Sequence, residues 1–388
     1  INNRNNVFSL VDGFGYYFYD AQKAPVGAIS SGSSSWNGRI VGSDNGDTDR
    51  YLTQGTSNDS PVGDGFKVTF ADNTDHLDIP SITQAGWQIV GTSLGTFTYR
   101  VNANAVTELN LLGNLSHVSF RKTGDLYGII LLPESATGAD IEAARKLLID
   151  RGAADGTTPT SLLSFWRNRF DIVEFYHVNT SSVTSPMRAW RNCSALTSFP
   201  LLDFNNAVGF QEAFKDCNSL QSFPAIQAPL CGNFSSTWHS CSALTSFPAS
   251  AQLGTSASNV NFSSAWQSSG LTSFSTPLPT ATNLGAAFRY CTPLVSFTLD
   301  ELPLVTSVST TWHNTRFQSF STKLPKVTNC YAAWYYNNAL TDFSADVFAN
   351  WNPSNIQNGV FNLTWTGCGG LTAQSVENIL TSIDSSGQ

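Results

Sequence analysis

The sequence has little charge and no long apolar run. Charged residues make up 12% of the chain, about half of the roughly 25% found in an average soluble domain. Neutral polar side chains must therefore cover most of the surface. The net charge of −8 argues against a nucleic-acid partner, which usually needs a clustered basic surface. Apolar runs such as Ile129 to Leu132 are far too short for a membrane span.

Motifs that carry catalysis are also missing. The sequence contains no nucleophile elbow, no phosphate-binding loop and no dinucleotide fingerprint. The five histidines stand in no fixed relation to a serine, a paired carboxylate or a metal motif, and no Cys-x-x-Cys pair supports zinc. We therefore expect a protein that is not an enzyme and that holds no cofactor.

What the sequence does contain is a repeat. From about residue 187, an aromatic residue is followed by cysteine three positions later, leucine six positions later and phenylalanine nine positions later, as in Trp190, Cys193, Leu196 and Phe199. The aromatic anchors are Trp190, Phe214, Trp238, Trp266, Phe288, Trp312 and Trp334, with spacings of 24, 24, 28, 22, 24 and 22 residues. A second register holds Phe199, Phe223, Phe247, Phe274, Phe297, Phe320 and Phe343. A weaker copy begins at Trp365.

A period in this range predicts a leucine-rich-repeat-like solenoid. Each repeat cannot bury its own apolar side, so the repeats stack, and equivalent residues form columns along the axis. The Leu-x-x-Phe segment predicts a short strand, and neighbouring strands pair in parallel about 4.8 Å apart. We expect mainly short parallel strands with turns, short helical insertions and a C-terminal capping helix.

The repeat resembles the BspA-like leucine-rich repeats of bacterial surface proteins, whose frame is Ala-Phe-x-x-Cys-x-x-Leu-x-x-aliphatic or aromatic. Ala213, Phe214, Cys217, Leu220 and Phe223 match every anchor. The chain departs from the frame by frequent tryptophan in place of phenylalanine, by Ser269 and Thr315 at cysteine positions and by Phe317 at a leucine position. The resemblance implies binding or adhesion. The C-terminal segment from Leu371 to Asp384 also resembles, more faintly, tail-fibre and adhesin-like proteins of marine bacteriophages.

We expect four regions along the chain. They are an irregular region rich in glycine, serine and asparagine at 1–65, a mixed α/β region with possible divergent first repeats at 66–174, the repeats at 175–371, and the capping helix and tail at 372–388. Helices are predicted at Ala139 to Arg151, stopped by Gly152, and at Thr160 to Arg169. Thr372 should N-cap the closing helix, whose Val376, Ile379 and Leu380 should seal the last repeat.

Two columns are candidate binding surfaces. The position after each anchor holds Arg191, Lys215, His239, Gln267, Arg289, His313 and Tyr335. In an acidic chain this stripe suits phosphate or uronate groups of a glycan, although it also fits a solvated turn that needs long polar side chains. The second row includes Thr197, Gln221, Thr245, Thr272 and Gln318. These side chains either bind sugar hydroxyls or merely solvate the strands.

The cysteines and two acidic loops offer further alternatives. Cys193, Cys217, Cys241 and Cys291 share one register, where buried thiols are expected, although adjacent repeats are close enough for disulfides. The loops Asp44 to Asp49 and Asp72 to Asp75 are rich in oxygen ligands for Ca²⁺ but lack the EF-hand pattern. Ordinary turns are the simpler interpretation of both loops.

The predicted function is binding outside the cytoplasm. We expect a phage tail-fibre or tail-associated receptor-binding protein that recognises a host-surface glycan or protein. The alternatives are a structural subunit of an extracellular filament or sheath and a bacterial cell-surface adhesin. We expect no nucleic-acid partner and no membrane insertion. Homo-oligomers or assembly with other structural subunits fit the same surface. The chain begins at Ile1 rather than Met, so we expect a processed protein or a piece of a longer one.

Overall fold

The computed structural model divides the chain into two units. The first consists of residues 1–160 and 165–182, and the second of 161–164 and 183–388. The described residues are 16–20, 27–28, 36–41, 50–52, 62–63, 68–70, 77–78, 85–102, 108–109, 124–150, 152–155, 160–176, 180–349 and 360–384. Within them, helices are few and most strands are short, and no helix is both long and apolar enough to cross a bilayer.

An antiparallel sheet forms the first unit. Its main path runs β12 (Ile172–Phe175), β9 (Gly95–Val101), β8 (Gly86–Thr92), β11 (Gly124–Pro133), β1 (Tyr16–Asp20), β3 (Trp36–Val41) and β4 (Arg50–Leu52). Off this path lie β2 (Gly27–Ala28), β5 (Val62–Gly63) and β6 (Val68–Phe70), while β7 (Leu77–Asp78) pairs with β10 (Glu108–Leu109). A two-residue turn joins β8 to β9, where the Thr92 hydroxyl donates to the Gly95 carbonyl at 2.9 Å.

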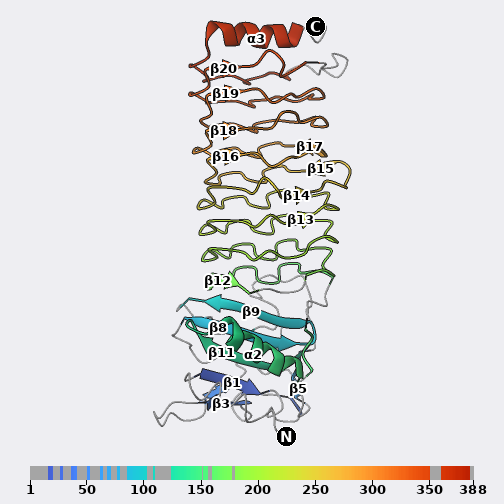
Figure 1. Ribbon diagram of the computed structural model, residues 1–388, viewed down its shortest axis with the longest axis vertical. Coiled ribbons are helices and arrows are strands. Elements are labelled where there is room, and N and C mark those ends of the chain that lie inside the picture. Colours follow the sequence, from blue (N-terminus) through green and yellow to red (C-terminus); the bar gives the residue numbers. More distant parts are fainter. Residues whose placement is uncertain are drawn as a thin grey trace. The chain divides into compact units, whose positions relative to one another are not determined.

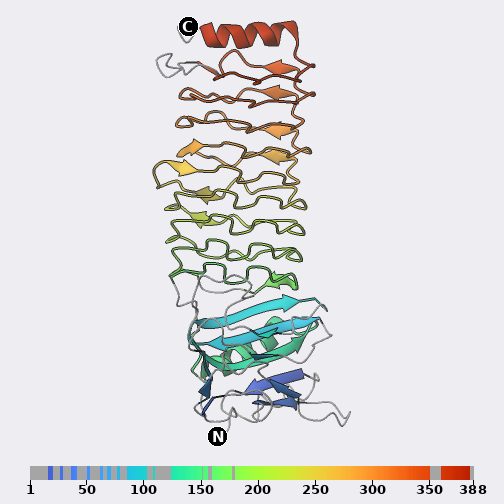
Figure 2. The ribbon, with the colours of Figure 1, turned by 180° about the vertical axis from the view of Figure 1, so that it is seen from behind.

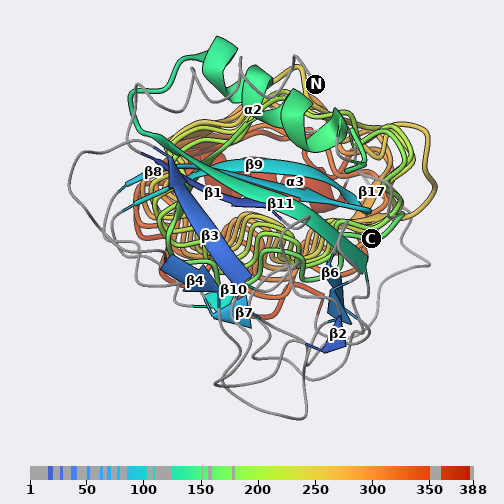
Figure 3. The same cartoon turned by 90° about the horizontal axis from the view of Figure 1, so that it is seen from below.

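Helix α2 (Gly138–Asp150) covers one face of this sheet (Figure 3). A reciprocal cap starts it: the Thr137 hydroxyl accepts from the Asp140 amide, and the Asp140 carboxylate accepts from the Thr137 amide at 2.8 Å. Its buried residues Ile141, Ala144 and Leu148 pack against apolar side chains of β8 and β11. The helix predicted at 139–151 is therefore present, and Gly152 follows it with φ of 110°.

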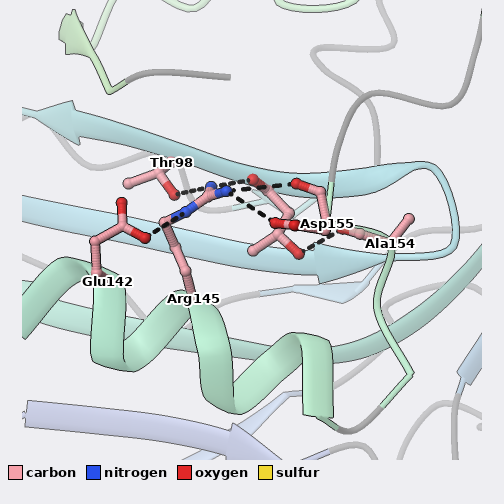
Figure 4. A network of polar contacts seen from close by, with 6 residues as sticks. Thr98, Glu142, Arg145, Ala154 and Asp155 are labelled. Atoms are coloured by element: carbon pink, nitrogen blue, oxygen red, sulfur yellow. Dashed lines mark hydrogen bonds and ion pairs between the residues drawn. The ribbon is translucent and has the colours of Figure 1, made fainter. Parts of the chain in front are cut away.

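Two buried arginines tie the first unit together. The Arg145 guanidinium leaves α2 and donates to the Thr96 carbonyl at 2.7 Å and to the Thr98 hydroxyl at 3.3 Å (Figure 4). Arg169 makes two 2.8 Å bonds to the Asp171 carboxylate and lies over the Tyr99 ring. Each buried charge thus has polar or charged partners, as a buried charge requires.

Two predictions for this part of the chain differ from the structure. Within the region 66–174, predicted as mixed α/β with divergent first repeats as one option, residues 86–101 form the antiparallel β8 and β9, whose residues are almost all buried. The helix predicted at Thr160 to Arg169 is absent, because Ser164 and Asn168 are left-handed at φ of 55° and 63°. The apolar spacing of Leu162, Phe165 and Trp166 imitates a helix, but the local backbone is that of the repeats.

Successive repeats lie one above the other in the second unit (Figures 1 and 2), and their turns superimpose in a view along the stack (Figure 3). Their short strands pair in parallel: β13 (Gln227–Ala228) with β14 (Gln252–Leu253), β15 (Val260–Asn261) with β17 (Ala281–Asn283), β16 (Ser273–Phe274) with β18 (Ser296–Phe297), and β19 (Ser319–Phe320) with β20 (Asp342–Phe343). The amide of each anchor also donates to the next repeat, as from Trp238 to the Ala265 carbonyl at 2.7 Å. Backbone amides of each repeat are therefore hydrogen-bonded to carbonyl groups of the next repeat.

Left-handed residues shape every turn around an anchor. In each of the seven regular repeats, the residues two before and two after the aromatic have positive φ, as at Glu212 and Asp216 around Phe214. This conformation costs roughly 1–2 kcal/mol for a residue other than glycine. The amide of the left-handed residue recovers part of this cost by donating to the next repeat, as from Asp216 to the His239 carbonyl at 2.8 Å.

Most aromatic rings of the core lie in two columns. Four of the six successive pairs of regular anchors stack, with centroids 5.3 Å apart for Trp238 and Trp266 and 5.1 Å apart for Trp266 and Phe288. Between the columns the rings meet edge to face, as for Trp266 and Phe274 at 4.8 Å. Both arrangements are favourable for aromatic pairs and add to the burial of their area.

The cysteine column lies beside the anchors. All seven cysteines are at described positions and are buried thiols. The Cys217 thiol donates to the Trp190 carbonyl at 3.1 Å, and the Cys291 thiol to the Trp266 carbonyl at 3.0 Å. Burial raises the pKa of Cys291 to about 11. These thiols therefore serve as protonated donors that bridge repeats.

Helix α3 (Ala373–Asp384) covers the last repeat (Figure 1), and its buried residues are Ser375, Ile379 and Ser382. Thr372 caps it by accepting from the Ser375 amide at 3.1 Å. The Ser375 and Ser382 hydroxyls accept from the Phe343 and Phe348 amides at 3.1 and 2.7 Å. An open edge needs hydrogen-bond partners, and these serines supply them.

Of the three apolar residues predicted to seal the last repeat, one is buried and two are exposed. Ile379 is buried, whereas Val376 and Leu380 are 45% and 62% exposed. The prediction for these two residues was wrong, because the edge of the last repeat presents backbone polar groups and selects the serine face of α3.

Replacing a core anchor should destabilise the stack far more than replacing an exposed aromatic. Trp266 is fully buried, so we expect Trp266→Ala to lower the free energy of unfolding by about 3–5 kcal/mol. Tyr336, which is 50% exposed, gives a matched control, and Tyr336→Ala should cost less than about 1 kcal/mol. Denaturant titration measures both values, and equal losses would contradict the assignment of Trp266 to the core.

Candidate functional site

The residues that follow the anchors form one column, called here the first column. The amide of the residue after each column member donates to the carbonyl of the next member, as from Asn192 to Lys215 at 2.7 Å and from Ser268 to Arg289 at 2.9 Å. Its side chains are half-buried: Arg191, Lys215, His239, Gln267, Arg289, His313 and Tyr335. The structure therefore brings the predicted residues of this set into one row on one face of the stack.

The N-terminal half of the first column carries its own counter-charge. Glu212 contacts Arg191 and accepts from Arg188 Nε at 2.9 Å. Burial raises the pKa of Glu212, but the hydrogen bond from Arg188 and the charges of Arg191 and Lys215 outweigh it and lower the pKa overall. Glu212 therefore partly neutralises the cationic stripe expected from Arg191 and Lys215. The spacing of the repeats did not predict that Glu212 would lie beside Arg191.

His239 sits in the middle of the first column. Burial and the neighbouring Lys215 lower its pKa, against the opposing effect of Asp216 and Glu212. Its Nδ1 has no hydrogen-bond partner within the described residues. His239 is therefore neutral at physiological pH and adds no cation to the stripe.

The C-terminal half of the first column is aromatic and open. We call Arg289, Tyr290, His313, Tyr335 and Tyr336 the Tyr–His–Arg cluster. Ring centroids are 5.0 Å apart for Tyr290 and His313, 4.9 Å for His313 and Tyr335, and 4.4 Å for Tyr335 and Tyr336. Tyr290 and Tyr336 are 40% and 50% exposed. The cluster thus presents ring faces and hydroxyls on a stack of rigid turns.

Arg289 completes the Tyr–His–Arg cluster. Its guanidinium lies 4.7 Å from the centroid of the Tyr290 ring, and Nη2 donates to the Tyr290 hydroxyl at 3.1 Å. Among the described residues no carboxylate pairs with Arg289, and its Nε has no partner. Burial and the charge of Arg289 lower the pKa of His313. The cluster therefore holds one unneutralised cation.

Tyr290 and Tyr336 were noted from the sequence only as aromatic neighbours that favour sugar binding, and were not among the predicted site residues. They lie two positions after their anchors, where the other repeats have Asn192, Asp216 or Ser240. A comparison of this position across the repeats would have revealed the change from small polar residues to tyrosine.

The second column contains the polar pairs that precede each strand phenylalanine. The Gln221 amide donates to the Thr197 carbonyl at 3.0 Å, and the Thr272 amide to the Thr245 carbonyl at 3.0 Å. In most repeats both members of the pair are exposed, since the two flanking residues, Leu and Phe, are both buried. Gln318 is likewise exposed and accepts at its carbonyl from the Thr341 hydroxyl at 3.1 Å.

Some hydroxyls of the second column already have backbone partners. The Thr272 hydroxyl donates to the Thr245 carbonyl at 3.2 Å, so this side chain helps to join repeats. A shallow hollow beside this column is lined by Ser296, Ser319, Ser321 and Asp300 together with apolar residues of the same two turns. The second column is therefore polar except at Val295, and its five predicted residues include no cation and no exposed ring.

The candidate calcium loops, Asp44 to Asp49 and Asp72 to Asp75, lie outside the described residues. Within the described part of the chain, no group of three histidine, cysteine, aspartate or glutamate side chains could hold a metal ion. The calcium hypothesis therefore stays a prediction.

Comparisons with known proteins give one distant structural likeness. No protein-family model matches the chain, and no curated protein matches it. A leucine-rich repeat protein from Bacteroides ovatus is similar in structure, with a TM-score of 0.24 and 12% identity over 52% of this chain and 70% of that chain. A likeness this weak supports no statement about function.

The two column histidines should make stability depend on pH. Their pKa values are lowered in the folded protein, so the unfolded chain binds protons first. Their contribution is complete above about pH 6.5, the unfolded pKa, and is lost as the pH falls below it. We expect the free energy of unfolding to fall between about pH 7.5 and pH 5, and to fall less in the double variant His239→Gln, His313→Gln.

Denaturant titrations at the two pH values measure this difference. The pKa of Glu212 is lowered, so its contribution is lost only at more acidic pH, below the unfolded value of about 4.3. An identical pH dependence in the double variant would contradict the assignment to these histidines.

Proposed function

We propose that the stacked repeats are a leucine-rich-repeat-like solenoid that binds a glycan outside the cytoplasm through the first column. The observation that carries this proposal is the Tyr–His–Arg cluster, in which exposed rings and an unneutralised arginine stand on rigid turns. Sugar rings present C–H groups that pack on the negative faces of aromatic rings. Their hydroxyls bond to tyrosine hydroxyls and guanidinium groups.

The proposed function is binding without catalysis and without a cofactor. Both settings weighed from the sequence share this chemistry: a phage tail-fibre receptor-binding protein and a bacterial surface adhesin. Low charge, many neutral polar residues and a repetitive surface suit either one. Partner proteins on a host surface are recognised by the same kinds of contact, since aromatic and arginine residues also dominate protein interfaces.

Binding to a glycan array and to whole cells tests this proposal. We expect the triple variant Arg289→Ala, Tyr335→Ala, Tyr336→Ala to lose binding. The matched variant Gln221→Ala, Thr245→Ala, Thr272→Ala changes three residues of the second column and should retain it. Binding lost only in the second variant would move the site to the second column, and no binding to any glycan would overturn the proposal.

Self-assembly into a filament or sheath is a second candidate function. Val376 and Leu380, one turn apart on α3, are 45% and 62% exposed. An exposed apolar pair at the end of a repeat stack suits contact with another copy.

Sedimentation velocity over a range of concentrations tests this alternative. Assembly through α3 predicts larger species that disappear in the double variant Val376→Ser, Leu380→Ser. They should persist in Val295→Ser, which changes a 58% exposed valine of the second column. A monomer at every concentration would exclude self-assembly through α3.

A further inference from the structure

We infer that the Tyr–His–Arg cluster is a subsite for an acidic sugar, and that Arg289 receives the sugar carboxylate. This inference rests on the proposed glycan-binding function and narrows its ligand to a uronic-acid glycan. The first column contains two arginines, Arg191 and Arg289, which differ in their carboxylate partners.

Arg191 shows how the first column satisfies an arginine. Its carboxylate partner, Glu212, lies in the next repeat, two residues before the anchor Phe214. The residue at the same place beside Arg289 is Thr310, two residues before Trp312. Both Glu212 and Thr310 have left-handed backbones, with φ of 54° and 53°. Arg289 therefore stands in the same setting as Arg191 but lacks the carboxylate.

A carboxylate of a ligand fits the position beside Arg289 that corresponds to that of Glu212 beside Arg191. Arg289 is held in place because its guanidinium lies over the Tyr290 ring and donates to the Tyr290 hydroxyl. Its Nε is buried without a partner, whereas its Nη1 is not buried and makes no hydrogen bond among the described residues. A guanidinium with an unused, accessible N–H group in a fixed position binds a carboxylate with charge-assisted hydrogen bonds.

The tyrosines around Arg289 favour a sugar as the carrier of that carboxylate. The Tyr–His–Arg cluster extends over three successive repeats, about 10 Å at ~4.8 Å per repeat, which suits an oligosaccharide. Tyr290 and Tyr336, 40% and 50% exposed, lie at its two ends, and Tyr331, 42% exposed, belongs to the same repeat as Tyr336. An acidic peptide would use Arg289 but would leave these ring faces without sugar-like C–H partners.

Calorimetric titration with acidic oligosaccharides tests the inference. The ligands are trigalacturonate, trimannuronate and a hyaluronan tetrasaccharide, each beside its methyl ester, which keeps the sugar and removes the charge. We expect at least one acid to bind roughly tenfold more tightly than its ester, since a hydrogen bond to a charged group contributes that much. Arg289→Gln should abolish this preference.

Thr310→Glu provides the sharper variant. The new carboxylate takes the position beside Arg289 that Glu212 has beside Arg191, so it neutralises the Arg289 guanidinium within the protein. The affinity for the acid should therefore fall at least as much as in Arg289→Gln. Ser236→Glu is the matched control, because Ser236 has the same place and a left-handed φ of 53° three repeats before Thr310. It adds the same charge two repeats away from Arg289 and should leave binding within about twofold. Thermal unfolding of each variant checks that the stack is intact.

Four outcomes would overturn the inference. Equal affinity for acid and ester would exclude carboxylate recognition. An equal loss in Ser236→Glu and Thr310→Glu would reduce the effect to net charge. Binding of neutral glycans without any binding of the acids would reject the subsite while the proposed function stands. Failure of every glycan would reject both.

Discussion

The structure of the second unit depends on one constraint: every repeat must bury an aromatic anchor and pair its backbone with the next repeat. Where successive anchor rings stack, their centroids are about 5 Å apart, for example 5.3 Å between Trp238 and Trp266, which is close to the spacing of hydrogen-bonded strands. Ring stacking and backbone pairing therefore agree on one repeat distance. The other features of the unit follow from this agreement.

The constraint explains why a surface site could form from residues far apart in sequence. Turns of 22 to 28 residues bring the residue after each anchor to the same place, so Arg289, His313 and Tyr335 lie in one column although 46 residues separate the first from the last. Left-handed residues recur two positions before and two positions after each anchor, so the turn that carries these side chains has the same backbone in each repeat. The chemistry of the column can then vary along the stack without disturbing the core, from paired charges near Arg191 to exposed rings near Tyr336.

The period of the sequence predicted the positions of residues that recur in every repeat, but it predicted few of the contacts that occur only once. The anchors, the strand phenylalanines and the members of the first column share a fixed offset, so their alignment could be predicted from spacing alone. The Arg191–Glu212 contact could not, because it joins different offsets in adjacent repeats. The turns at 160–169 were mistaken for a helix, since left-handed Ser164 and Asn168 leave no signal in the apolar pattern. In α3, the need to pair backbone groups of the last repeat outweighed apolar burial of Val376 and Leu380.

Amide hydrogen exchange at single-residue resolution tests the central claim, the register of the repeats, most directly. The amides two residues after the anchors, as at Asp216, Ser268 and Tyr290, belong to surface turns yet donate to the next repeat at 2.8, 2.9 and 2.9 Å. The account predicts strong protection of these amides in every regular repeat. Exchange at the rate of an unstructured chain at these positions would contradict the stacked register and the columns built on it.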